Sequence, residues 1–224
     1  DASPGPPSMV DLGTVTAQHM GWHAGNLMYV VVATSLANMI ISAAVSVYWH
    51  QRHRSILWGL VSSMAPGIAM GVLLGSLISH GLSSHLIKNL FGVFVLVIAI
   101  RLFFLVKPKL GRTLPGVFIR SSVALFIGLK SSLLGLGGGA ITVPFFLRSN
   151  VSIHHATATS AACSLMISIL GTLVYALLAF NNHVHIPGCT GYVYWPAFFG
   201  IATTSSFVAP FGVKCAQWLP TDTL

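Results

Sequence analysis

Residues 117–148 read VFIRSSVALFIGLKSSLLGLGGGAITVPFFLR, an apolar stretch interrupted by the run Gly135-Leu136-Gly137-Gly138-Gly139. Glycine is a poor helix former because it loses the most backbone freedom on folding, so this cluster predicts a break in a helix. The apolar piece after it, Ala140–Leu147, is too short to cross a bilayer, which takes about 20 residues. The stretch therefore predicts a broken, re-entrant hairpin that returns to the side on which it began.

The composition around this hairpin is that of a membrane protein. Of the 224 residues, 54% are hydrophobic and 6% are charged, whereas about a quarter of the residues of a soluble domain are charged. The three acids, Asp1, Asp11 and Asp222, all lie near the termini. We expect an all-α integral membrane protein that crosses the inner (plasma) membrane several times, with the lipid bilayer as its main partner.

Five further apolar segments are each long enough to cross a bilayer. They are residues 28–49, 56–79, 86–106, 156–180 and 192–218. They divide the chain into a polar N-terminal segment, a first repeat of three transmembrane helices, a cytoplasmic basic loop, and a second repeat that contains the hairpin and two helices. The boundaries are 1–27, 28–106, 107–116 and 117–224. The N-terminal segment has no pattern of a signal peptide.

The cations indicate the orientation in the membrane. Seven of them fall on one side of this arrangement and one, Lys88, falls on the other, which predicts that the cation-rich side is cytoplasmic. The seven are Arg52, Arg54, Lys107, Lys109, Arg112, Arg120 and Arg148. The cations lie between apolar runs and not beside aromatic residues on a polar face, so we expect no nucleic-acid partner.

The chain contains an internal duplication. Ala33-Thr34-Ser35 recurs 125 residues later as Ala158-Thr159-Ser160, and beyond the next loop an offset of 137 matches Trp58 with Trp195. An odd number of crossings separates the copies because the hairpin returns, so the two repeats are predicted to be inverted. Inverted repeats with a broken helix are typical of transporters that bind substrate near the membrane midplane.

Both repeats carry a polar stripe on one helix face, because residues four apart share a face. The stripes are Thr34, Asn38, Ser42 and Ser46 in the first copy, and Ser160, Ser164, Ser168 and Thr172 in the second. They line a pathway, or they allow close packing of membrane helices; the sequence leaves both interpretations open. The series Gly67, Gly71 and Gly75 has the small-residue spacing of helix packing alone.

The run Gly128–Gly139, followed by Ile141, Val143 and Pro144, resembles the signature of the TauE/SafE sulfite exporter family. The Ala-Thr-Ser helix starts, the basic loop His50–Arg54 and the glycine-rich helix around Pro66 are also similar to that family. The resemblance covers roughly residues 28–224. It implies a permease that moves sulfite, organosulfonates or other small anions, usually outward.

The family normally has a first copy of the Gly-rich hairpin and a last helix, which would match Val10–Thr14 and follow Leu224. Neither is found, so we expect both terminal elements to be lacking. The alternative function is therefore a transport-incompetent membrane remnant or a partner subunit.

The hairpin suits an anion, because a break at glycines leaves free backbone N–H groups beside a positive helix N-terminus. Lys130 is an ionisable residue inside an apolar segment, which indicates function, unless it snorkels to the headgroups or is buried in its neutral form. The substrate-binding residues predicted are Lys130, Ser131, Ser132, Gly135, Gly137, Gly138, Gly139, Thr34, Ser35, Asn38, Thr159 and Ser160. We expect a small anion as substrate, no cofactor, and possible homo-oligomers.

Two other classes of site have weak support. An intramembrane enzyme would need paired carboxylates, an HExxH motif or a serine–histidine dyad. The apolar body has neither of the first two, and the histidines that a dyad would need are confined to loops and ends. A soft-metal site could combine His183, His185 and Cys189 with His154 and His155, but the two groups are predicted on opposite sides of the membrane.

Overall fold

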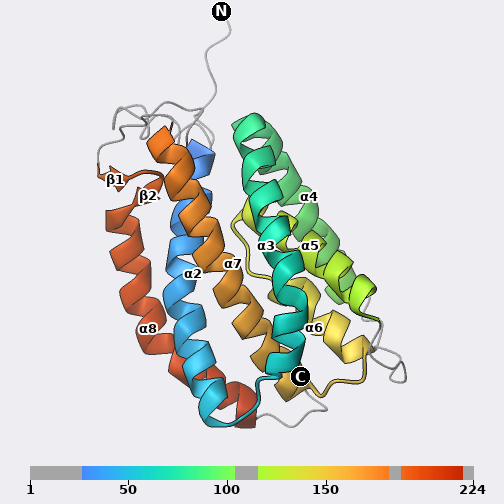
Figure 1. Cartoon of the computed structure of the whole chain (residues 1–224). Coiled ribbons are helices and arrows are strands. Elements are labelled where there is room, and N and C mark those ends of the chain that lie inside the picture. The colour runs from blue at the N-terminus through green and yellow to red at the C-terminus, as the bar shows by residue number, and fades with distance from the viewer. Residues whose placement is uncertain (1–26, 104–115, 182–187, 219–224) are drawn as a thin grey trace, which may run out of the picture.

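The computed structural model describes residues 27–103, 116–181 and 188–218. The helices are α2 (Leu27–Arg52), α3 (Trp58–Gly81), α4 (Ser84–Phe103), α5 (Val117–Leu134), α6 (Gly139–Arg148), α7 (Ile153–Asn181) and α8 (Trp195–Trp218), and two short strands are β1 (Cys189–Thr190) and β2 (Val193–Tyr194). The helices run up and down along one bundle (Figure 1). The predicted segments 1–27 and 107–116 lie outside the described residues, apart from Leu27 and Gly116.

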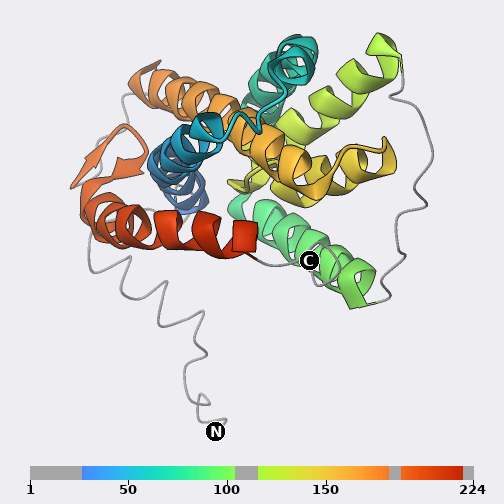
Figure 2. The ribbon, with the colours of Figure 1, turned by 90° about the horizontal axis from the view of Figure 1, so that it is seen from below.

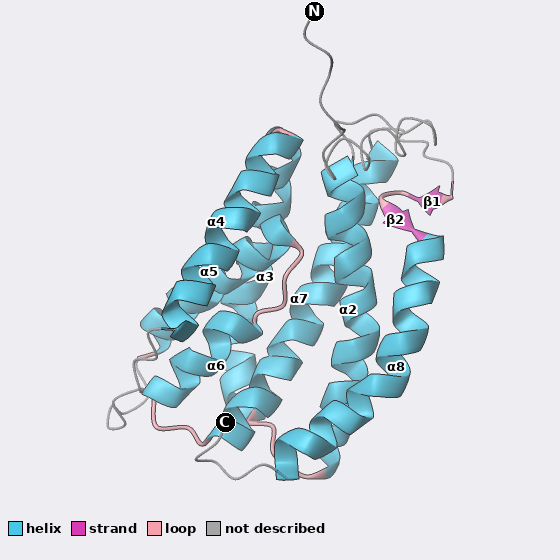
Figure 3. Ribbon diagram, turned by 180° about the vertical axis from the view of Figure 1, so that it is seen from behind, coloured by secondary structure: helices cyan, strands magenta, loops and turns pink. Residues whose placement is uncertain are grey.

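The prediction of an all-α membrane protein is confirmed. In the described part of the chain, four helices are long and apolar enough to cross a membrane, namely α2, α3, α5 and α7. In α4 the apolar part, His85–Ile100, is shorter. Helices α4 and α8 nevertheless extend along the same bundle as the longer helices (Figure 3).

The re-entrant hairpin is present, with one difference from expectation. Helix α5 enters from the end of the bundle where α2 finishes, and α6 returns toward that end after the break (Figures 1 and 3). However, α5 alone has 18 residues and is apolar enough to cross a membrane, with about 27 Å of helix. The break therefore lies within the bundle, far from the end at which α5 begins (Figures 1 and 3).

The last helix begins later than predicted. Residues 192–194 were expected to be helical, but Cys189↔Tyr194 and Thr190↔Val193 pair as an antiparallel ribbon. The helix starts at Trp195, just as α3 starts at its sequence counterpart Trp58. Each indole N–H also bonds a side chain of the preceding element: Trp58 donates to Gln51 in the last turn of α2 and Trp195 donates to Thr190 on β1, both at 2.8 Å.

Helices α2 and α7, which carry the Ala-Thr-Ser sequences, pack against each other at the centre. They run in opposite directions, as do α3 and α8 (Figure 1). Seen along the bundle, α8 lies beside α2, whereas α3 lies beside α7 on the other side and carries α5 (Figure 2). Each central helix thus has one long outer helix beside it, and the inverted duplication stays a prediction.

Glycines allow α3 and α5 to pack with their backbones in contact. A Cβ at Gly67 would lie 2.5 Å from the carbonyl oxygen of Ser121, and one at Gly71 would overlap the carbonyl oxygen of Leu125. Gly128 of α5 faces the backbone of Ile68 in the same way. The packing role predicted for the glycine series is therefore what the structure shows, and it fixes the hairpin against α3.

Replacing Gly71 by Ala should destabilise the protein by about 1–3 kcal/mol, the usual cost of overpacking, because the new methyl group meets backbone that cannot move aside. Gly59→Ala on the same helix is the matched control, since nothing lies within 4 Å of a Cβ there. The measurement is the midpoint of thermal unfolding in detergent. Equal midpoints for the two variants would contradict the packing described.

Candidate functional site

The break at the end of α5 is built by a left-handed residue. Gly135 has φ 65°, and its N–H bonds the carbonyl of Ser131, closing the last turn. The next N–H, that of Leu136, bonds the same carbonyl at 3.2 Å. Glycine is suited to this position because a Cβ is disfavoured at positive φ. The chain then turns, and α6 begins at Gly139.

Between the two helices a row of backbone amides has no acceptor. The N–H groups of Gly137, Gly138, Gly139 and Ala140 make no hydrogen bond with any other described residue. The first amides of a helix never have partners within the helix, and they carry its partial positive charge. Three consecutive glycines add no side chain that could cover them.

The break lies where the two Ala-Thr-Ser helices meet. Ser35 of α2 donates a hydrogen bond of 2.9 Å to the carbonyl oxygen of Gly135. On the other side, a Cβ at Gly139 would lie 3.7 Å from the hydroxyl of Ser160 on α7. Ser35 and Ser160 are counterparts at the offset of 125, so corresponding residues of the two repeats flank the break.

Gly137 has the same relation to both repeats. Its nearest neighbours are Met39 Sδ on α2 and Ser164 Oγ on α7, at 3.0 and 3.5 Å from the position of a Cβ. Met39 and Ser164 are again separated by 125 residues. The unpaired amides therefore lie between α2 and α7, beside residues that the offset of 125 relates.

The two serines in the last turn of α5, Ser131 and Ser132, differ in their contacts. Ser132 hydrogen-bonds the hydroxyl of Ser76 on α3, and its carbonyl accepts the hydroxyl of Tyr175 on α7 at 3.0 Å. Ser131 is fully buried, and its hydroxyl has no partner among the described residues. Ser132 is thus engaged in packing, whereas Ser131 remains a free hydroxyl one turn before the break.

Lys130 is buried and not snorkelling. Its side chain is 5% exposed, and its ammonium nitrogen has no hydrogen-bond partner among the described residues. The nitrogen lies 4.5 Å from the centre of the Phe94 ring on α4, a cation–π contact. The described residues contain no Asp or Glu, so this charge has no carboxylate partner there.

Thr34 and Thr159 bond backbone N–H groups just before α8 and α3, on β2 and in the loop after α2, and not the break. Thr34 Oγ1 accepts the N–H of Tyr194 at 3.0 Å, and Thr159 Oγ1 accepts the N–H of Leu57 at 3.1 Å. Of the predicted residues, the structure therefore brings Ser35, Ser160 and the glycines together and places the two threonines elsewhere.

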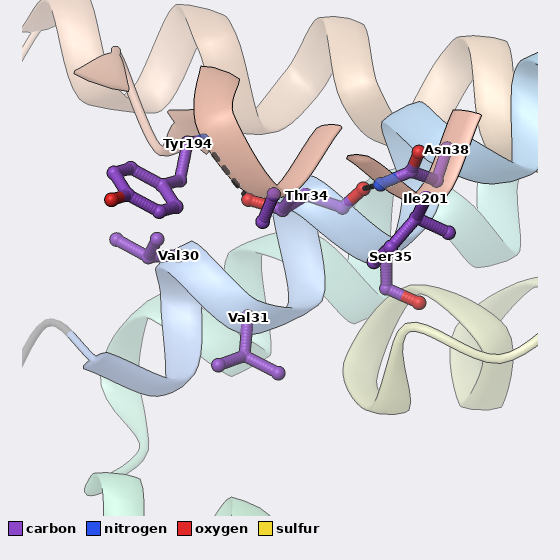
Figure 4. A pocket seen from close by; sticks show the side chains of 8 residues that line it. Val30, Val31, Thr34, Ser35, Asn38, Tyr194 and Ile201 are labelled. Atoms are coloured by element: carbon purple, nitrogen blue, oxygen red, sulfur yellow. Dashed lines mark hydrogen bonds between the residues drawn. The ribbon is translucent and has the colours of Figure 1, made fainter. Parts of the chain in front are cut away.

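Asn38 and its neighbours line a cavity of about 300 Å³ between α2 and α8 (Figure 4). Asn38 donates from Nδ2 to the carbonyl of Thr34 at 3.1 Å, and its Oδ1 is buried with no partner among the described residues. The surface of the cavity is mostly apolar. The residues that line it are Val30, Val31, Thr34, Ser35, Asn38, Tyr194, Ala197 and Ile201. Ser35 thus belongs both to this cavity and to the break.

No sequence pattern pointed to Ser76, Phe94 and Tyr175, which contact Lys130 or Ser132. Each comes from a different helix, so no local spacing connects them. The weak metal hypothesis also receives no support from the described residues, which hold no group of three ligating side chains. Cys189 lies on β1 at the end opposite His154 and His155, and burial raises the pKa of its thiol; His183 and His185 lie outside the described residues.

Comparison with known proteins identifies the family to which the chain belongs. It is 29% identical over 199 residues to a probable membrane transporter protein of Haemophilus influenzae, covering 88% of this chain and 75% of that one. It is 27% identical over 194 residues to a probable membrane transporter protein of Methanocaldococcus jannaschii, covering 83% and 69%. No solved structure gives a significant match. The sequence profile of the family described as sulfite exporter TauE/SafE matches residues 15–224, and the chain, with its glycine-broken hairpin, belongs to that family of membrane transporters.

Proposed function

We propose that this protein is a permease for small anions of the sulfite or organosulfonate type in the plasma membrane, and that the anion binds at the break between α5 and α6. We infer transport and not catalysis. The observation that carries the proposal is the row of unpaired amides at Gly137–Ala140. Such amides at a helix N-terminus attract anions.

The depth of the break makes these amides expensive unless a ligand or water satisfies them. Irregular backbone at membrane depth is tolerated only where it is buried in protein or lines a wet cavity. The two hydroxyl groups beside it, Ser35 and Ser160, come from both central helices. An anion there would accept hydrogen bonds from amides of the hairpin and from the serine of the second repeat.

Lys130 favours an anion through its charge. It lies five residues before Gly135, about 7–8 Å along the helix, and no carboxylate is present in the described residues to neutralise it. At this distance in a partly desolvated interior, the Coulomb attraction between a positive charge and an anion is at most several kcal/mol. Its ring contact with Phe94 keeps the charge available, because a cation–π contact does not cancel it.

The first test is uptake of radiolabelled sulfite and of a panel of small organosulfonates and carboxylates into proteoliposomes that contain this chain. We expect flux of at least one anion, and loss of that flux in Lys130→Ala with membrane insertion unchanged. Lys88→Ala is the control, because Lys88 is exposed at the start of α4. Unchanged flux in Lys130→Ala would remove Lys130 from the site. No flux of any anion would favour the alternative, a transport-incompetent remnant or partner subunit.

The second test concerns the attachment of the break to α2. Ser35→Ala removes the hydrogen bond to the Gly135 carbonyl, so the amides should be held less firmly. We expect the KM of the transported anion to rise about fivefold, which corresponds to one hydrogen bond of typical net strength. Ser122→Ala is the control, since Ser122 is exposed on α5 and bonds only the carbonyl of Phe118 on its own helix. Equal KM values in the two variants would contradict this role of Ser35.

A further inference from the structure

Two hydroxyl-to-amide contacts in the bundle correspond to each other in sequence and lie at its opposite ends. Thr34 and Thr159 are separated by the offset of 125, and their donors, Leu57 and Tyr194, by the offset of 137. Each threonine accepts the N–H of the residue just before a helix: Leu57 precedes α3 and Tyr194 precedes α8. These two hydrogen bonds are thus a further observation in favour of the duplication.

The two contacts are crossed between the repeats. Thr34 on α2 bonds Tyr194 at the end of β2, which leads directly into α8, and Thr159 on α7 bonds Leu57, which leads directly into α3. Both threonines are buried, at 6% and 0% exposure. A helix start is one of the few places where a backbone N–H is free to bond such a hydroxyl. Each contact therefore joins two rigid helices at one defined point.

The contacts lie toward opposite faces of the membrane. Helix α2 begins at the end that carries the β1–β2 ribbon, here called the ribbon face, and Thr34 lies in its second turn. Helix α7 begins at the other end, here called the cation face because α2 and α6 end there (Figure 1), at Arg52 and Arg148, and α5, with Arg120 in its first turn, begins there. Between them lie the two central helices and the break.

We propose that Thr34 and Thr159 are positioning residues that hold the ribbon face and the cation face closed, each through its own helix contact, so that releasing one opens the path to the break from that side alone. This inference rests on the proposed transport function. Thr34 closes α8 onto α2 beside the cavity that Thr34, Ser35 and Ala197 line. Thr159 closes α3 onto α7 beside Leu60, the sequence counterpart of Ala197.

The test measures access from each side and needs no substrate. Two single-cysteine reporters, Ala197→Cys and Leu60→Cys, are made in a background in which Cys163, Cys189 and Cys215 are replaced by Ala. A membrane-impermeant maleimide is applied to vesicles of either orientation. Thr34→Val should make the reporter at 197 react about fivefold faster from the ribbon face, the population change given by one hydrogen bond of typical strength. It should leave the reporter at 60 unchanged, and Thr159→Val should do the opposite from the cation face.

Two controls separate this role from a general loosening of the fold. Thr157→Val on α7 should change neither reporter, because the Thr157 hydroxyl bonds only carbonyls of its own helix, those of Ile153 and His154. Thr34→Ser and Thr159→Ser keep the hydroxyl and should restore the original labelling. The proposal is overturned if both reporters respond together in either valine variant, if neither responds, or if the serine variants behave like the valine variants.

The outcome of the labelling experiment does not depend on which anion the protein transports. One-sided changes in labelling, together with absence of flux for every anion tested, would uphold the positions of the two contacts and reject the proposed substrate class. Flux that is lost in Lys130→Ala, together with labelling that never becomes one-sided, would uphold the permease and reject this inference.

Discussion

Backbone polar groups at membrane depth must find partners inside the protein, and most of this structure follows from that constraint. Its described helices satisfy their amides internally along most of their length, and the exception is the junction of α5 and α6. There the chain cannot be helical, because Gly135 is left-handed and three glycines follow within four residues. The surrounding helices are arranged so that α2 and α7 both contact this junction.

Enclosure requires close approach, and small residues provide it on both sides of the hairpin. The glycines of α3 admit the backbone of α5, and the serines of the central helices reach the break without filling it. Bulky side chains at these positions would separate the helices and open the junction to lipid. The small residues and the free amides therefore depend on each other, because tight helix packing around the break allows backbone N–H groups within it to remain without partners.

Much of this arrangement could be predicted from the sequence, because the signals are local. Long apolar runs predict the helices, and the glycine cluster at 135–139 predicts the break. The start of α8 was predicted three residues early because hydropathy does not distinguish the ribbon at 189–194 from a helix. The stripe residues could be placed on a face but not assigned to partners. Thr34 and Ser35 are adjacent, yet one contacts α8 and the other the break, and that division depends on how the helices cross. The partners of Lys130 and Ser132 come from three distant helices, so no spacing rule could have revealed them.

The crossed threonine contacts also bear on how the chain is made. Leu57, before the start of α3, donates to the hydroxyl of Thr159, which lies 102 residues further along the chain. Thr34 accepts from Tyr194, which lies 160 residues further along. Loops of this length must close before either bond forms, and such non-local pairing slows folding. During synthesis the first three helices would enter the membrane with a buried threonine and a helix start still unpaired. The two halves of the chain should therefore fold poorly when they are separated. If the chain arose by gene duplication, the two copies would be expected to stay fused, because each half depends on a hydroxyl group of the other.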